Sequence, residues 1–132
     1  LGLCVHPEIE YVKVKDLEKN IFIIMAKARI EAYKKNFKYE EVETFTGAAL
    51  RGEKYEPLFP YFNKLENDGY FVMLNDEYVT TTDGTGIVHQ APGFGEDDNR
   101  VMKAAGLLEV IVPLDISSKF TADAKDFAGM YI

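Results

Sequence analysis

The 132-residue sequence predicts one domain of the α+β class, built on a bent or barrel-like β-sheet with a few helices at its periphery. Short runs of alternating or β-branched apolar residues recur along the chain, and glycines, prolines and polar turns separate them. Only two stretches have helical periodicity. No internal repeat, linker or low-complexity segment divides the sequence, and its length fits a single domain.

The first part of the chain predicts strands and one helix. Residues 1–5 form a strand-like run, and residues 11–15 alternate apolar with polar side chains. A polar turn joins this second strand to the apolar run 21–24, which predicts a β-hairpin. Residues 26–35 predict a helix with one apolar and one charged side, and residues 39–45 return to the alternation of a strand.

The second part of the chain predicts shorter elements. Residues 55–59 are an edge strand or a loop, because Pro57 cannot donate to a β-ladder. The other elements are a strand at 70–74, an extended run that begins at Tyr78-Val79, a strand at 86–91, a helix at 96–105 stopped by Gly106, and an extended run at 110–114. Residues 120–132 have little regular pattern.

Charge and composition exclude several classes of function. The chain carries 22 Asp and Glu against 15 Lys and Arg, so its net charge of −7 repels a long phosphate backbone, and any contact with nucleic acid has to be small and local. The longest apolar run, residues 21–26, is far short of the roughly 18 residues of a membrane helix, and no secretion signal is present. Cys4 is the only cysteine, which fits a reducing compartment and excludes an internal disulfide. The sequence has neither a Cys/His zinc cluster nor the motifs of a P-loop or a serine-hydrolase elbow.

The segment from Gly84 to Asp98 is the most informative part of the chain. Gly84 and Gly86 flank Thr85, and glycine lets a ligand approach the backbone closely, although a Gly-x-Gly sequence also suits a simple hairpin turn. The hydroxyls of residues 80–82 could bind a ligand, but an exposed threonine strand is the commoner reason for such a run.

A histidine and an acidic helix start complete this segment. His89 shares its side-chain direction with Ile87 and Ala91, so it is either an ordinary core or surface residue or the wall of a pocket. Asp97 and Asp98 open the predicted helix, where a carboxylate either offsets the helix dipole or serves as a fixed partner for a ligand ammonium. Glu96 is an equal candidate on composition alone. These residues predict a small-ligand pocket with an anionic anchor.

The same residues resemble the hallmark of the editing domain of class I aminoacyl-tRNA synthetases. The matching residues are Gly84-Thr85-Gly86-Ile87-Val88-His89-Gln90-Ala91-Pro92, followed by Gly95 and Asp98. Valyl and leucyl relatives usually carry Lys or Met in place of His89, so the histidine indicates the isoleucyl branch of the family, of the eukaryotic type. Two further stretches agree with this resemblance, which runs along essentially the whole chain: Phe45-Thr46-Gly47-x-x-Leu50-x-Gly52-x-x-Tyr55-x-Pro57-Leu58-Phe59, and His6-Pro7-Glu8 ahead of Tyr11-Val12.

The resemblance implies a fold, an activity and partners. In the family this domain, called CP1, is a β-barrel with peripheral helices that is inserted into the catalytic domain. It implies post-transfer editing, the hydrolytic deacylation of valine misattached to isoleucine tRNA. The partners are then the acceptor end of tRNA(Ile) and the remainder of the synthetase. No metal or cofactor is implied for this domain, because ATP and Mg serve the synthetic domain. We expect a cytoplasmic, monomeric chain with no membrane contact.

The resemblance also implies roles for individual residues. Asp98 would hold the α-ammonium of the misattached amino acid, and His89 would wall the pocket that measures its side chain; these two are the implied catalytic residues. Gly84, Thr85 and Gly86 would shape the floor of the pocket. Phe94 would contact the substrate. Water would attack the ester carbonyl, with backbone or hydroxyl donors meeting the oxyanion.

The chain departs from the family pattern in ways that leave alternatives open. Family members carry a threonine-rich segment with a neighbouring tryptophan before the equivalent of Leu1; this chain has no tryptophan, and its residues 80–82 do not take that place. The segment that follows Ile132 in the family and the synthetic-site motifs are also missing. We therefore expect residues 1–132 to be a single editing domain, truncated at both ends and excised from a larger synthetase. The main alternative is a non-catalytic module that binds tRNA or an amino acid without hydrolysing it, followed by a valyl or leucyl relative and an unrelated α+β domain.

Overall fold

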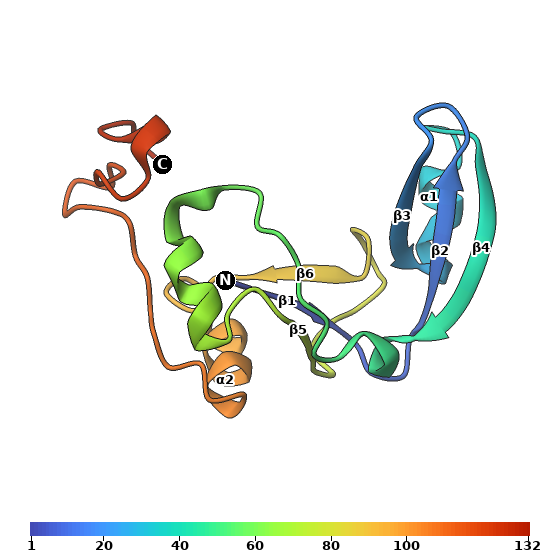
Figure 1. Ribbon diagram of the computed structural model, residues 1–132, viewed down its shortest axis with the longest axis horizontal. Coiled ribbons are helices and arrows are strands. Elements are labelled where there is room, and N and C mark those ends of the chain that lie inside the picture. Colours follow the sequence, from blue (N-terminus) through green and yellow to red (C-terminus); the bar gives the residue numbers. More distant parts are fainter.

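A computed structural model describes residues 1–132, and its strands form two separate three-stranded sheets (Figure 1). In the first sheet, the central strand β1 (Gly2–Val5) is parallel to β5 (Met73–Asn75) and antiparallel to β6 (Ile87–Gln90). In the second sheet, the central strand β2 (Glu10–Asp16) is antiparallel to both β3 (Ile21–Ala26) and β4 (Tyr39–Thr46). The predicted strands at 1–5, 39–45 and 86–91 and the predicted hairpin are therefore confirmed.

The helices are short and lie around the two sheets. The two α-helices are α1 (Ile30–Tyr33), against the second sheet, and α2 (Glu96–Ala104), beside the first sheet (Figure 1). The four 3₁₀ helices are η1 (Lys27–Arg29), η2 (Gly47–Leu50), η3 (Pro60–Asp68) and η4 (Lys125–Phe127). None of the helices combines the length and the apolar character that crossing a membrane requires. Gly106, with a φ of 80°, follows the end of α2 as the sequence predicts.

Buried side chains tie the two sheets and α2 together. Val5, Tyr11, Ala26 and Met73 form one apolar cluster across the space between the sheets. On the other side of the first sheet, Cys4 and Val79 pack against Val101 of α2. A further cluster joins η3 to α2 and consists of Leu65, Tyr70, Phe71, Met102 and Leu107. The first sheet therefore has the second sheet on one side and α2 on the other, with β6 reaching toward both.

The mixed helix-and-sheet class is confirmed, while the barrel stays a prediction. Both sheets are open, and no strand of the chain closes either of them into a barrel.

The predicted helix at 26–35 is wrong at its start and much too long. Ala26 has extended backbone angles and ends β3, because its N–H donates to the carbonyl of Thr85. Only the 3₁₀ turn η1 and the single turn of α1 follow it. A backbone contact between distant segments has overridden the helical periodicity.

Three predicted extended segments are also shorter or absent. The strand expected at 70–74 begins only at Met73, because Phe71 has a φ of 60°, outside the extended region. The run expected from Tyr78 is a turn, closed by the bond from its N–H to Asp76 Oδ1 at 3.1 Å. Residues 110–114 find no partner strand beyond a single bridge at Leu114. Residues 55–59 form a loop, one of the two predicted possibilities.

Candidate functional site

The segment 84–98 surrounds β6, and its predicted site residues separate to the two ends of this strand. We call residues 82–86, before β6, the loop end, and residues 89–98, from the last two residues of β6 into α2, the helix end. The strand between them is four residues long, so side chains that are neighbours in the motif need not be neighbours in space.

The loop end is held by its backbone carbonyls. Three consecutive carbonyl oxygens accept hydrogen bonds from donors in the second sheet or directly after it: Gly84 from Arg29 Nε at 2.8 Å, Thr85 from the Ala26 N–H at 2.8 Å, and Gly86 from the Tyr11 hydroxyl at 2.6 Å. Arg29 also donates to the carbonyl of Thr82 at 3.2 Å. The loop is therefore fastened to the second sheet.

The two glycines of the loop end have different reasons to be glycine. Gly86 has a φ of 75°, and a Cβ built on it would lie 2.6 Å from the Cβ of Ala26, so packing excludes any side chain. Gly84 has a φ of 58° but faces open space within 4 Å. Both positions favour glycine through their backbone angles, and only Gly86 requires it for packing.

The helix end is held by the carboxylate of Asp98. Its Oδ2 accepts the N–H of Ala91 at 2.9 Å, and its Oδ1 accepts the hydroxyl of Tyr78 at 3.0 Å. Gly95 lies so close that a Cβ there would come within 2.6 Å of the same carboxylate. The structure thus separates the two aspartates of the motif, because Asp97 is exposed and pairs with Arg100 at 3.0 Å instead.

An apolar cavity of about 390 Å³ opens beside the helix end. His89 and Phe94 line it, together with Ala91 and Pro92 from the intervening turn. The remaining walls come from Leu1, Tyr55, Pro57, Leu58, Phe59, Tyr61, Phe62, Phe71, Ile111 and Pro113. This volume is typical of a small-ligand site, and it exceeds what one amino-acid side chain fills.

The ring of His89 lies between the cavity and the start of β1. Its Nε2 is 3.3 Å from the amine of Leu1, which donates to the carbonyl of Gln90 at 2.7 Å. Partial burial lowers the pKa of His89, and the nearby Leu1 ammonium lowers it further, while the charge of Asp98 acts in the opposite direction. This place therefore favours a neutral imidazole.

The structure brings together only part of the predicted site. His89 and Phe94 line one cavity, and Asp98 adjoins it through its bond to Ala91 without being a lining residue. Gly84, Thr85 and Gly86 do not line this cavity, and their carbonyls turn toward the second sheet. Their assignment to the floor of the pocket stays a prediction. Residues 80–82 are not in a strand, and Thr80 and Thr82 are exposed.

A second cavity, of about 650 Å³, lies between the two sheets. It is lined by residues from both sheets, among them Leu3, Ile24 and Met73. None of the predicted site residues lines it, although Ile87, which follows Gly86 in the sequence, does. No group of three or more His, Cys, Asp or Glu side chains is placed to hold a metal ion.

Three residues that the sequence did not single out hold the site in place. Tyr11 and Arg29 hold the loop end, and Tyr78 holds Asp98. No local signal could have found Tyr11 or Arg29, because their partners lie 75 and 55 positions away in the sequence. For Tyr78 a local signal existed in Asp76, because an aspartate often accepts the backbone N–H two residues later and so closes a turn with its side chain.

Comparison with known proteins identifies relatives along the whole chain. The chain is 45% identical over 137 residues to the cytoplasmic isoleucine–tRNA ligase of Mus musculus, and 42% identical over 139 residues to the cytoplasmic isoleucine–tRNA ligase of Saccharomyces cerevisiae. Both alignments cover 100% of the chain, which spans 11% and 13% of the length of these relatives. No protein-family model matches the chain.

The fold also has a known counterpart. The crystal structure of GlLeuRS-CP1, a CP1 editing domain of a leucyl-tRNA synthetase, matches with a TM-score of 0.64 over 94% of this chain and 54% of that chain. At 20% identity this likeness concerns the fold alone. Together, the sequence and fold matches confirm the resemblance that the motifs indicated.

Proposed function

We propose that this chain, which is homologous over its whole length to one segment of the isoleucine–tRNA ligases and has the fold of a CP1 domain, hydrolyses valine from mischarged isoleucine tRNA. The observation that carries the proposal is the helix end of β6. There an apolar cavity with His89 and Phe94 on its wall adjoins the carboxylate of Asp98.

In this proposal Asp98 binds the α-ammonium of the misattached valine. A carboxylate has about four lone-pair positions, and Ala91 and Tyr78 use two of them, so acceptor capacity remains on both oxygens. An ammonium that bonds to this carboxylate brings the valine side chain toward the apolar cavity. His89 and Phe94 then contact the hydrocarbon, and the ester carbonyl stays on the open side, where water reaches it.

The hydrolysis follows the ordinary course of ester cleavage. Water adds to the carbonyl carbon, the bond to the ribose oxygen breaks, and the released ribose hydroxyl takes the proton that water gives up. The negative oxygen of the intermediate needs hydrogen-bond donors that are already in place. Free valine and deacylated tRNA are the products.

Editing of this kind is needed because a single binding pocket discriminates poorly between two amino acids that differ by one methylene group. One methylene group is worth only about 1–3 kcal/mol in an apolar pocket, and the choice of the isoleucyl enzyme between isoleucine and valine is the standard example of this limit. A second pocket that admits valine and excludes isoleucine overcomes it. We assign the exclusion to His89, because its ring lies on the wall of the cavity.

The test measures deacylation of valyl-tRNA(Ile) by the chain alone and by a chimera, in which the chain replaces the matching segment of the Saccharomyces cerevisiae isoleucine–tRNA ligase. We expect Asp98→Ala to lower the rate about 100-fold, because the substrate ammonium loses its charged partner and hydrogen bonds to charged groups contribute about 1.5–3 kcal/mol. Asp97→Ala is the matched control, since this neighbouring aspartate is exposed and pairs with Arg100. Equal rates for Asp98→Ala and Asp97→Ala would refute the anchor.

Two further outcomes separate the size filter and the alternative function. His89→Ala is expected to admit isoleucine, so that isoleucyl-tRNA(Ile) is deacylated as well; continued sparing of isoleucine would remove the filter from His89. Hydrolysis by the chain alone would exclude the alternative of a binding module without activity. That alternative is favoured by one observation, namely that both oxygens of Asp98 already have partners within the protein.

The setting of this activity is part of the same proposal. The relatives from mouse and yeast are named as cytoplasmic proteins, and we infer a cytoplasmic location for this chain. Because the chain spans only 11–13% of these relatives, we infer that the remainder of a synthetase delivers the tRNA acceptor end. The β-barrel belongs to the proposal too, since the chain covers 54% of a CP1 domain and its two sheets are open.

A further inference from the structure

A tyrosine outside the motif contacts the carboxylate on which the proposed function depends. Tyr78 lies in the turn after β5, and its hydroxyl donates to Asp98 Oδ1 at 3.0 Å. The same hydroxyl accepts from Nε2 of the buried Gln90 at 3.4 Å. We propose that Tyr78 is a positioning residue that fixes the orientation of the Asp98 carboxylate for a substrate ammonium. This inference rests on the proposed function.

The geometry gives the carboxylate of Asp98 two supports from different segments. The N–H of Ala91 meets one oxygen, and the hydroxyl of Tyr78 meets the other. With the Ala91 contact alone, the carboxylate can rotate about that single bond. The second donor fixes the plane of the group and leaves each oxygen one further acceptor position. A binding group works best when neighbouring hydrogen bonds lock its rotamer.

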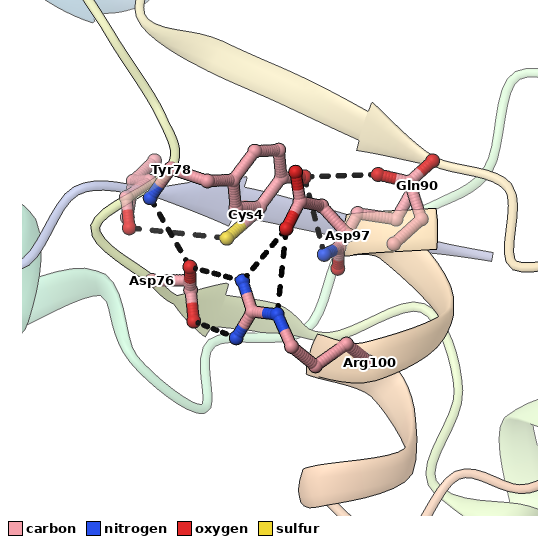
Figure 2. Close-up of polar contacts among 8 residues, drawn as sticks. Cys4, Asp76, Tyr78, Gln90, Asp97 and Arg100 are labelled. Atoms are coloured by element: carbon pink, nitrogen blue, oxygen red, sulfur yellow. Dashed lines mark hydrogen bonds and ion pairs between the residues drawn. The ribbon is translucent and has the colours of Figure 1, made fainter. Parts of the chain in front are cut away.

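Tyr78 is itself fastened to the helix that carries Asp98. Oδ1 of Asp76 accepts the N–H of Tyr78 at 3.1 Å. The guanidinium of Arg100, two residues after Asp98 in α2, donates to both oxygens of Asp76 at 2.8 and 2.9 Å. Figure 2 shows Asp76 between Tyr78 and Arg100, with Gln90 on the far side of the tyrosine ring. These bonds connect the turn that carries Tyr78 to the helix that carries Asp98.

The tyrosine is suited to act as a permanent donor. Burial raises the pKa of Tyr78 above its usual range, and the bond to Asp98 acts in the same direction, whereas the bond from Gln90 opposes it. The phenol therefore keeps its proton over the whole neutral range.

The test replaces the hydroxyl and retains the ring. We expect Tyr78→Phe in the chimera to lower kcat/KM for valyl-tRNA(Ile) about tenfold, since hydrogen bonds to charged groups are among the stronger ones. The loss should appear mainly as a raised KM, because a loosened anchor weakens substrate and transition state alike. Tyr33→Phe is the matched control, because this tyrosine lies in α1, against the second sheet, and lines neither of the two cavities.

A double-mutant cycle separates positioning from a merely structural role. The probe is valine joined to adenosine by an amide bond, and its affinity is measured for the chain itself. Tyr78→Phe should weaken binding about tenfold in the chain with Asp98 present and should have no effect in the Asp98→Ala chain, because the tyrosine acts only through that carboxylate. An equal effect in both backgrounds would overturn the inference.

Further outcomes keep the inference separate from the proposed function. If Asp98→Ala reduces deacylation and Tyr78→Phe stays within twofold of the unaltered chimera, the inference is wrong and the proposed function stands. If Asp98→Ala has no effect, both are wrong. Where Tyr78→Phe does not fold, Asp76→Asn loosens the turn without touching the phenol, and it should lower kcat/KM two- to threefold only when Asp98 is present; no change would overturn the inference.

Discussion

The two ends of β6 are separated by a strand of only four residues, yet different hydrogen bonds hold each of them. At the loop end, three backbone carbonyls accept from Tyr11 and Ala26 of the second sheet and from Arg29 of η1, directly after it. At the helix end, a side-chain carboxylate accepts from one backbone N–H and one hydroxyl. The loop end is a joint between the two sheets, whereas the helix end adjoins a cavity.

This difference shows that one continuous motif can contain residues that packing requires beside residues that packing does not require. Gly86 has a sufficient reason to be glycine in its contact with Ala26, without any ligand. His89 and Asp98 have no comparable packing reason for their identity, because the His89 ring is only partly buried and Asp98 forms a partly exposed polar contact. A match to the whole motif therefore does not make every residue in it a substrate contact.

The largest expected effect on stability concerns the loop end. We expect Gly86→Ala to lower the free energy of unfolding by about 3 kcal/mol, because it combines an unfavourable positive φ with a 2.6 Å contact to Ala26. Gly84→Ala, which faces open space, should cost only about 1 kcal/mol. Urea unfolding of both variants measures the difference. Equal costs would mean that the loop is not packed against the second sheet as described.

The next largest expected effect is the loss of the Tyr11 hydroxyl, which connects the loop end to the second sheet. Tyr11→Phe should cost about 2 kcal/mol, because the carbonyl of Gly86 loses its donor and the N–H of His6 loses its acceptor. Tyr61→Phe, at an exposed position, should change stability by less than about 0.5 kcal/mol. Thermal unfolding of the two variants is the measurement. A Tyr11→Phe chain as stable as the Tyr61→Phe chain would contradict the joint.

The smallest expected effect is the pH dependence of the ion pair between Asp76 and Arg100, which joins the turn after β5 to α2. The Arg100 guanidinium holds the pKa of Asp76 below its usual value, so the contribution of this carboxylate to stability is present above about pH 4 and is lost as the pH falls through the lower folded value. Asp76→Asn should therefore lower the free energy of unfolding by about 1 kcal/mol at pH 7 and by less at pH 3. The cost at pH 7 is small because Arg100 is 54% exposed, so that solvent screens the ion pair.

Unfolding measured at both pH values tests this prediction. The loop end offers the comparison, because its donors bond to backbone carbonyls that do not titrate. The cost of Tyr11→Phe should be the same at pH 7 and pH 3. A cost of Asp76→Asn that grows at low pH would reverse the sign and contradict the assignment.

Local pattern was sufficient to predict elements whose partners lie nearby. The alternation in β2 and the apolar run of β3 predicted the hairpin, and the acidic start and Gly106 predicted both ends of α2 to within one residue. The same reasoning failed where a distant segment decides the backbone. Ala26 leaves the helical pattern to bond with Thr85, and Phe71 takes a φ of 60° just before β5.

The candidate site was predictable as a set of residues and only partly as an arrangement. The motif identified His89, Phe94 and Asp98, which the fold places at one end of β6. It could not show that Gly84, Thr85 and Gly86 turn their carbonyls away from that end, because the donors come from the second sheet and from η1, which are distant in the sequence. Nor could it identify Tyr78, whose role depends on the position of α2.

The most direct test of the account is a crystal structure of the chain with valine joined to adenosine through an amide bond, which resists hydrolysis. We predict that the valine ammonium lies about 2.8 Å from an oxygen of Asp98 and that the isopropyl group contacts His89 and Phe94. No contact is expected with the carbonyls of residues 84–86. An analogue bound elsewhere, with Asp98 still paired only to Ala91 and Tyr78, would contradict the central claim.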